Sequence, residues 1–222
     1  HSHRVQAGDV IQLGFASKGV RAYLGVAGGF DVKKQFGSCS TVVREGVGGL
    51  NGKALQAKDL LPAAEHKATY NLLMRPEDIP SYQQELNLRV LPGCQQHWFS
   101  RLQQRRFFSG EYLVSKQWDR MGYRLQGPVI KCRQTSMLSE GISYGAIQLP
   151  ADGQPIVLLN DRQTIGGYPK IGSVLSLDLA KLAQCGQGAR VRFEAISMDK
   201  AHNLLHLARY KYQQTQVYQT AL

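Results

Sequence analysis

Residues 139–172 read SEGISYGAIQLPADGQPIVLLNDRQTIGGYPKIG and place strand and turn signals in close succession. Apolar runs at 145–149, 155–160 and 171–177 have strand length, and Pro, Gly, Asn and Asp separate them. Runs of the same kind lie outward from this stretch at 86–91, 111–117, 122–130 and 189–196. Short strands at such spacing predict a mainly β fold, either a barrel or a sandwich.

Helical periodicity is limited to three segments. Residues 95–104 and 178–184 each predict a short helix of one to three turns. Residues 198–215 set apolar side chains along one stripe, with Ser197 as the expected N-cap. We therefore expect an amphipathic C-terminal helix docked on the rest of the fold.

The N-terminal third differs in character from the rest. Alternating apolar residues at 9–15 and 20–27 predict a hairpin, and the glycine-dense segment 28–52 predicts a long ordered loop. A polar, proline-punctuated stretch follows and has the composition of a linker. We expect a partial β-rich domain, truncated at its start, at residues 1–85 and a β-barrel domain at residues 86–222.

Composition excludes several classes of protein. An apolar content of 43% with 19% charged residues is typical of globular chains and excludes disorder as the main state. No apolar run approaches the roughly 18 residues of a membrane-spanning helix, so no membrane partner is expected. The net charge of +11 makes nucleic-acid binding a function to consider, but the basic residues are scattered and no nucleic-acid motif accompanies them.

The spacing of the cysteines indicates the redox state of the compartment in which the protein resides. They are widely spaced, with no CxxC pair and no close histidine that would complete a zinc set, and they are Cys39, Cys94, Cys132 and Cys185. This pattern predicts free thiols, no metal site and a reducing cytoplasm.

The segment 160–169 joins polar side chains to paired glycines where a strand ends. It offers a carboxylate, an amide and a phenol, from Asp161, Gln163 and Tyr168. Gly166 and Gly167 can take positive φ and open their backbone N–H groups to a carbonyl or phosphate oxygen. The same composition also suits an ordinary β-turn whose aspartate caps its own backbone.

A second polar segment surrounds Arg120 in the sequence DRMGYRL at 119–125. Its guanidinium group suits bidentate binding of a carboxylate or phosphate, although a surface pair with Asp119 is the simpler alternative. The GxxxxGK[ST], HExxH and GxGxxG motifs are all missing from the sequence, so no ATP site is assigned to this chain.

Several motifs, taken in order, resemble the family of the 5-oxoprolinase C subunit, also called KipA-like, biotin-dependent carboxyltransferase-like or allophanate hydrolase subunit 2. They are YLGVAGGFDV, FGSCST, GVGGLNGKAL, DRMGYRLQGP, the stretch 139–172 and the late LAQ…GARVRF. Family members also carry an N-terminal TVQDxGR-like motif, which this sequence does not contain. We therefore expect the family's N-terminal region to be missing.

The resemblance implies a cyclophilin-like β-barrel with a few short helices. It also implies a hydrolase component that is active only in a complex and takes part in ATP-dependent opening of 5-oxo-L-proline to L-glutamate. The implied partners are the 5-oxoprolinase B subunit, which is KipI-like, and the separate A subunit. ATP would be used by the complex, with Mg²⁺ as its only accompanying metal.

The site roles are hypotheses built on these segments. Asp161 is expected to position water as a base, and Arg120 to hold the substrate carboxylate. The other expected catalytic residues are Gln163 and Tyr168, and the other expected substrate-binding residues are Gly166, Gly167 and Gln148. Both segments are expected to meet in one pocket at the rim of the barrel.

Two alternatives stay open on the sequence. One is a carboxyltransferase-like subunit of a urea carboxylase or allophanate system, which would need carboxybiotin from another protein. The other is a non-catalytic, KipA-like regulator that binds a kinase inhibitor.

Overall fold

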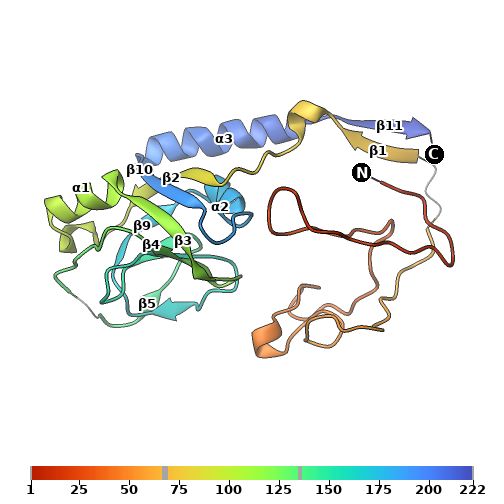
Figure 1. Cartoon of the computed structure of the whole chain (residues 1–222), viewed down its shortest axis with the longest axis horizontal. Helices are drawn as coiled ribbons and strands as arrows, with labels where there is room; N and C mark the ends of the chain where they lie inside the picture. Colours follow the sequence, from red (N-terminus) through yellow and green to blue (C-terminus); the bar gives the residue numbers. More distant parts are fainter. Residues whose placement is uncertain (1, 67–69, 135–136, 222) are drawn as a thin grey trace. The chain divides into compact units, whose positions relative to one another are not determined.

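A computed structural model describes residues 2–66, 70–134 and 137–221 of the chain (Figure 1). Contacts divide it into two units, each made of separate stretches. The first holds His1–Leu13, Ala22–Asp78 and Gln216–Leu222, and the second holds Gly14–Arg21 and Ile79–Thr215. This division is discontinuous, whereas the predicted one is a single boundary after residue 85.

The second unit is built on a closed barrel of seven strands in the order β10-β2-β9-β6-β7-β4-β3. Its strands are β2 Glu85–Pro92, β3 Glu111–Trp118, β4 Gly122–Gln126, β6 Ala146–Gln148, β7 Ile156–Leu158, β9 Lys170–Val174 and β10 Arg190–Ala195. All neighbours are antiparallel except β10 and β2, which run parallel. The predicted mainly β fold with a barrel is confirmed.

The barrel closes around an aromatic and aliphatic core. Inward positions alternate along the strands, so that Tyr123 and Leu125 of β4 are fully buried. Phe107 and Phe193 stack with ring centroids 4.4 Å apart, and Tyr112 lies edge-on to Phe193. Burial of these large side chains is the main stabilising contribution to the second unit.

In the described ranges, three α-helices accompany the barrel: α1 Arg101–Ser109, α2 Ser176–Leu182 and α3 Met198–Gln214. A short 3-10 turn, η3 Gln96–Trp98, precedes α1. Ser197 caps α3, because its hydroxyl accepts a hydrogen bond from Lys200 N at 3.2 Å. The predicted C-terminal helix and its cap are therefore confirmed. No helix in the described ranges has the length and apolar character needed to cross a membrane.

Two further sheets have two strands each. In the second unit β5 Glu140–Gly141 pairs with β8 Ile165–Gly166. In the first unit β1 Tyr70–Met74 pairs with β11 Val217–Ala221 (Figure 1). The 3-10 turns of the first unit are η1 Val43–Glu45 and η2 Pro76–Asp78.

The hairpin predicted at 9–15 and 20–27 is wrong, because neither range contains a strand. Its apolar side chains are largely exposed, including Phe15, and therefore lack the buried face that would select strand pairing. The glycine-dense segment that follows is a loop with isolated bridges, as predicted. There Gly48 has φ +78°, and a Cβ atom would lie only 2.0 Å from Ser40 O.

Residues 14–21, which we call the strap, contact the rest of the second unit. The buried Gln184 accepts hydrogen bonds from Val20 N at 3.1 Å and Arg21 N at 3.0 Å. The Arg21 guanidinium group donates to Tyr123 Oη at 3.0 Å and lies 5.7 Å from the Trp118 ring centroid. These contacts fix the strap at the barrel wall.

Candidate functional site

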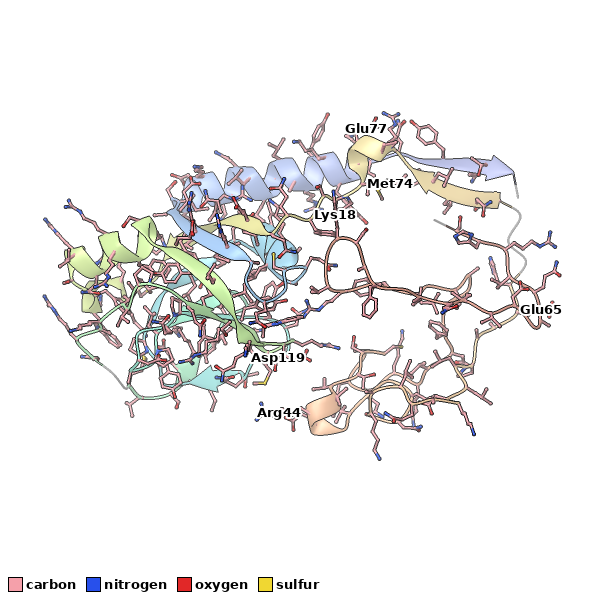
Figure 2. All side chains as sticks on the ribbon, viewed as in Figure 1. Lys18, Arg44, Glu65, Met74, Glu77 and Asp119 are labelled. Atoms are coloured by element: carbon pink, nitrogen blue, oxygen red, sulfur yellow. The ribbon has the colours of Figure 1, made fainter. Side chains whose placement is uncertain are left out.

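A cavity of about 510 Å³ lies at the wall formed by β3, β4, β6 and β7. Its lining includes Lys116, Trp118, Asp119, Gln148, Gln163 and Tyr168. Asp119, a lining residue that directly follows β3, is labelled in Figure 2. Three of the predicted site residues, Gln148, Gln163 and Tyr168, are thus brought together at one cavity.

Gln148 is the most unusual residue of this lining. It ends β6, its side chain is only 1% exposed, and its Nε2 has no hydrogen-bond partner among the residues described. An unmade hydrogen bond of a buried amide costs about 1–3 kcal/mol. Because native proteins rarely leave such donors unpaired, this amide is a candidate partner for a ligand oxygen.

Gly166 and Gly167, predicted to bind substrate, are not among the residues that line the cavity. Neither has the positive φ that we expected; Gly166 lies in β8, and the carbonyl oxygen of Gly167 accepts from Met137 N at 3.1 Å. A Cβ atom on Gly166 would lie 2.5 Å from Ile142 Cδ1 and 3.1 Å from Gln148 Nε2. A side chain at position 166 would therefore crowd Ile142 and the Gln148 amide.

The two predicted polar segments meet through Arg120 and Asp161. Arg120 Nε lies 2.8 Å from Asp161 Oδ2, and Nη2 donates to Oδ1 at 3.2 Å. The main chains also bond, from Asp161 N to Arg120 O at 3.0 Å. This bidentate pair occupies the guanidinium fork and both carboxylate oxygens, and neither residue lines the cavity.

Asp119 is used by the turn between β3 and β4. Its Oδ1 accepts from Met121 N at 2.7 Å and Gly122 N at 3.2 Å. It thus makes the local capping contacts typical of aspartate in turns, and the surface pair with Arg120 considered from the sequence is not formed.

Behind Gln148, a polar network fixes the neighbouring strands. The buried Gln95 donates to Glu140 Oε1 at 2.6 Å and accepts from Lys170 N at 2.8 Å. Lys170 also pairs with Glu140, and this hydrogen bond holds the pKa of the Glu140 carboxyl below its ordinary value. Since Lys170 is the β9 partner of Gln148, the network lies next to the backbone that carries the orphan amide.

Sequence reasoning missed Lys116 and Trp118, which also line the cavity. Lys116 has no ion-pair partner in the described part of the chain, whereas Arg124 of the same lining pairs with Asp152. The only local signal was the position of Lys116 and Trp118 close before the DRMGYRL segment.

The lining does not fit a magnesium nucleotide. Within the described ranges, no group of three or more His, Cys, Asp or Glu residues is placed to hold a metal. The nearby carboxylates of Asp119 and Asp161 are already engaged by backbone amides and by Arg120.

The chain matches a known class of domain. Residues 1–195 match the family described as the carboxyltransferase domain, subdomain A and B. The chain therefore belongs to this carboxyltransferase-domain family.

Particular relatives refine this placement. The 5-oxoprolinase C subunit of Escherichia coli (strain K12) is 39% identical over 89% of this chain and 63% of its own length. The 5-oxoprolinase C subunit of Haemophilus influenzae is 38% identical over 91% of this chain and 64% of its own length. This chain thus spans less than two thirds of either relative. The crystal structure of the K. lactis urea amidolyase matches with a TM-score of 0.74 and 26% identity, over 86% of this chain and 13% of that one.

Proposed function

We propose that this chain is part of the C subunit of an ATP-dependent 5-oxoprolinase, which opens 5-oxo-L-proline to L-glutamate together with the A and B subunits. The relatives at 39% and 38% identity support this assignment. The structural observation that carries it is the buried, unpartnered Nε2 of Gln148 beside a cavity of small-molecule size.

Lactam opening explains why a preorganised donor is useful. Water oxygen bonds to the carbonyl carbon, the ring C–N bond breaks, and the ring nitrogen takes up a proton. Negative charge develops on the carbonyl oxygen before the C–N bond breaks, and a buried donor stabilises that charge without reorganisation. We assign this role to Gln148 Nε2, with Tyr168 and Gln163 at the same cavity as further polar groups.

The Arg120–Asp161 pair receives a positioning role in this proposal. Its bidentate contact and the backbone bond between the two residues hold the segment 160–169 against the turn after β3. Gln163 and Tyr168 belong to that segment. We propose this role in place of the base and carboxylate anchor suggested by the sequence.

The test is ATP-dependent glutamate release by the full-length subunit with its partners. Gln148→Met removes the donor while keeping the volume, and we expect kcat to fall about 10²-fold to 10³-fold with the fold retained. Gln126→Met is the matched control, because Gln126 is exposed on β4 and does not line the cavity. Unchanged turnover in Gln148→Met would contradict the donor role, and no glutamate release by the wild-type complex would contradict the function.

A second candidate function is favoured by the match to the K. lactis urea amidolyase. Here the same cavity would accept a urea-like substrate, and carboxybiotin would come from another protein. Urea-dependent activity with an added biotin carboxylase, in place of 5-oxoproline turnover, would select this candidate. A purely regulatory KipA-like role would leave both activities absent.

We also propose a reducing, cytoplasmic setting. All four cysteines are free thiols, and Cys39 and Cys94 are exposed. Unpaired exposed thiols are typical of proteins kept in reducing compartments.

A further inference from the structure

An irregularity in β3 presents residues to the cavity. Val114 is paired with Leu125 and Trp118 with Tyr123, so four steps along β3 match only two along β4. The extra residues form a β-bulge, in which Ser115 Oγ accepts from Gln117 N at 3.1 Å. Bulges leave residues outside the ladder and re-aim their side chains, and they are frequent next to active sites.

Lys116 is one of the bulged residues and lines the cavity. It is exposed and lacks an ion-pair partner within the described ranges, while the other charged groups of the lining are engaged. Arg124 pairs with Asp152, and Asp119 accepts from two backbone amides. Among the described charged residues of the lining, the Lys116 ammonium group is therefore the one without an ion-pair or hydrogen-bond partner.

We propose that Lys116 forms a carboxylate-binding subsite that selects small anionic substrates over neutral ones. The proposal rests on the proposed function, because it places a second substrate contact in the same cavity. Gln148 Nε2 donates to the carbonyl oxygen, and the Lys116 ammonium group pairs with the carboxylate of the same molecule. 5-Oxoproline carries both groups, whereas urea has a carbonyl oxygen but no carboxylate.

Arg120, the carboxylate anchor expected from the sequence, is less suited to this role. Its fork is filled by Asp161, so binding a substrate carboxylate would break a bidentate pair. Lys116 has no such contact to break. Its flexible stem also lets the charge follow a small ligand.

Calorimetric titration of the whole 222-residue chain tests the subsite with three probes: 5-oxo-L-proline, 2-pyrrolidinone and urea. 2-Pyrrolidinone is the same lactam without the carboxylate. We expect wild type to bind 5-oxoproline at least about tenfold more tightly than 2-pyrrolidinone, and Lys116→Gln to remove this preference by weakening 5-oxoproline alone. Lys116→Arg should restore most of it, and Lys131→Gln, at an exposed lysine outside the cavity lining, should leave all three affinities unchanged.

The outcomes separate the subsite from the proposed function. Equal binding of 5-oxoproline and 2-pyrrolidinone by wild type, or an unchanged preference in Lys116→Gln, would overturn the subsite. Absence of 5-oxoproline binding to wild type would overturn it as well. Lys116-dependent binding, together with no glutamate release by the assembled complex, would support the subsite and contradict the proposed hydrolysis.

Discussion

Two buried tyrosines of the barrel differ in the hydrogen bonds that their hydroxyl groups make. Tyr112 is fully buried and its hydroxyl has no hydrogen-bond partner in the part of the chain described. Tyr123 is also fully buried, but its hydroxyl lies 3.0 Å from Arg21 Nη1 and 3.1 Å from Cys185 O. Burial raises the pKa of both phenols, so both hydroxyls stay protonated near neutral pH.

These two residues give a matched prediction on stability. Tyr112→Phe removes an unsatisfied polar group, and we expect the free energy of unfolding to stay constant or rise by up to about 1 kcal/mol. Tyr123→Phe removes satisfied bonds and leaves Arg21 short of a partner, so we expect a loss of about 1–2 kcal/mol. Urea denaturation of the two variants and wild type measures both values. Equal losses would contradict this account.

At the scale of elements, a buried ion pair ties α2 to β2. Asp178 in α2 is 1% exposed and accepts from Arg89 N at 3.0 Å, Nε at 2.8 Å and Nη2 at 2.6 Å. Burial raises the pKa of the Asp178 carboxyl, but the hydrogen bonds from Arg89 outweigh it and hold the net pKa below the ordinary value. The contact therefore favours folding most when Asp178 is ionised.

The sign of the pH dependence follows from that lowered pKa. The contribution of Asp178 is fully present above the unfolded value of about 3.9 and is lost as the pH falls through the lower, folded value. We expect Asp178→Asn to lose about 3 kcal/mol at pH 7, because Arg89 is left without its partner. Denaturation curves measured between pH 7 and pH 3 give the free energy of unfolding at each pH. We expect this free energy to fall less steeply with decreasing pH for the variant than for wild type. A parallel pH profile would contradict the prediction.

Elements with a local signal were predictable, and those that depend on distant partners were not. The run PIVLL at 155–159 signals a strand by itself, and the stripe of α3 signals a helix. The alternation at 9–15 gave the same signal but no strand, because no buried face forms there. The bulge in β3 exists only in relation to β4, so no pattern within β3 reveals it.

The candidate site was also predictable only where its residues carry a local sequence signal. Gln163 and Tyr168 were found because they lie in the polar segment 160–169, and Gln148 because it lies in the stretch 139–172 that carries the family resemblance. The structure places all three at one cavity. The lack of a hydrogen-bond partner for Gln148 Nε2 depends on which residues surround it in three dimensions, and the sequence does not show this. For the same reason, the pairing of Arg120 with Asp161, 41 positions away, was expressed in the sequence only as two separate polar segments.

At the scale of the whole molecule, the chain alone should lack 5-oxoprolinase activity. It spans 63% and 64% of its two 5-oxoprolinase relatives, and its cavity does not fit a magnesium nucleotide. We expect no ATP-dependent glutamate release from the isolated 222-residue chain, and recovery of release when the full-length protein is assembled with its partners. Measurable turnover by the isolated chain would contradict this prediction.

The discontinuous division of the chain has a consequence for anyone who cuts or truncates it. The backbone passes between the two units after residues 13, 21, 78 and 215. One protease nick after Asp78 would therefore release neither unit, and a fragment that starts at Ile79 would lose the strap with Arg21, the partner of Tyr123. A clone of the barrel must carry residues 14–21 as well, joined through a new linker or a circular permutation.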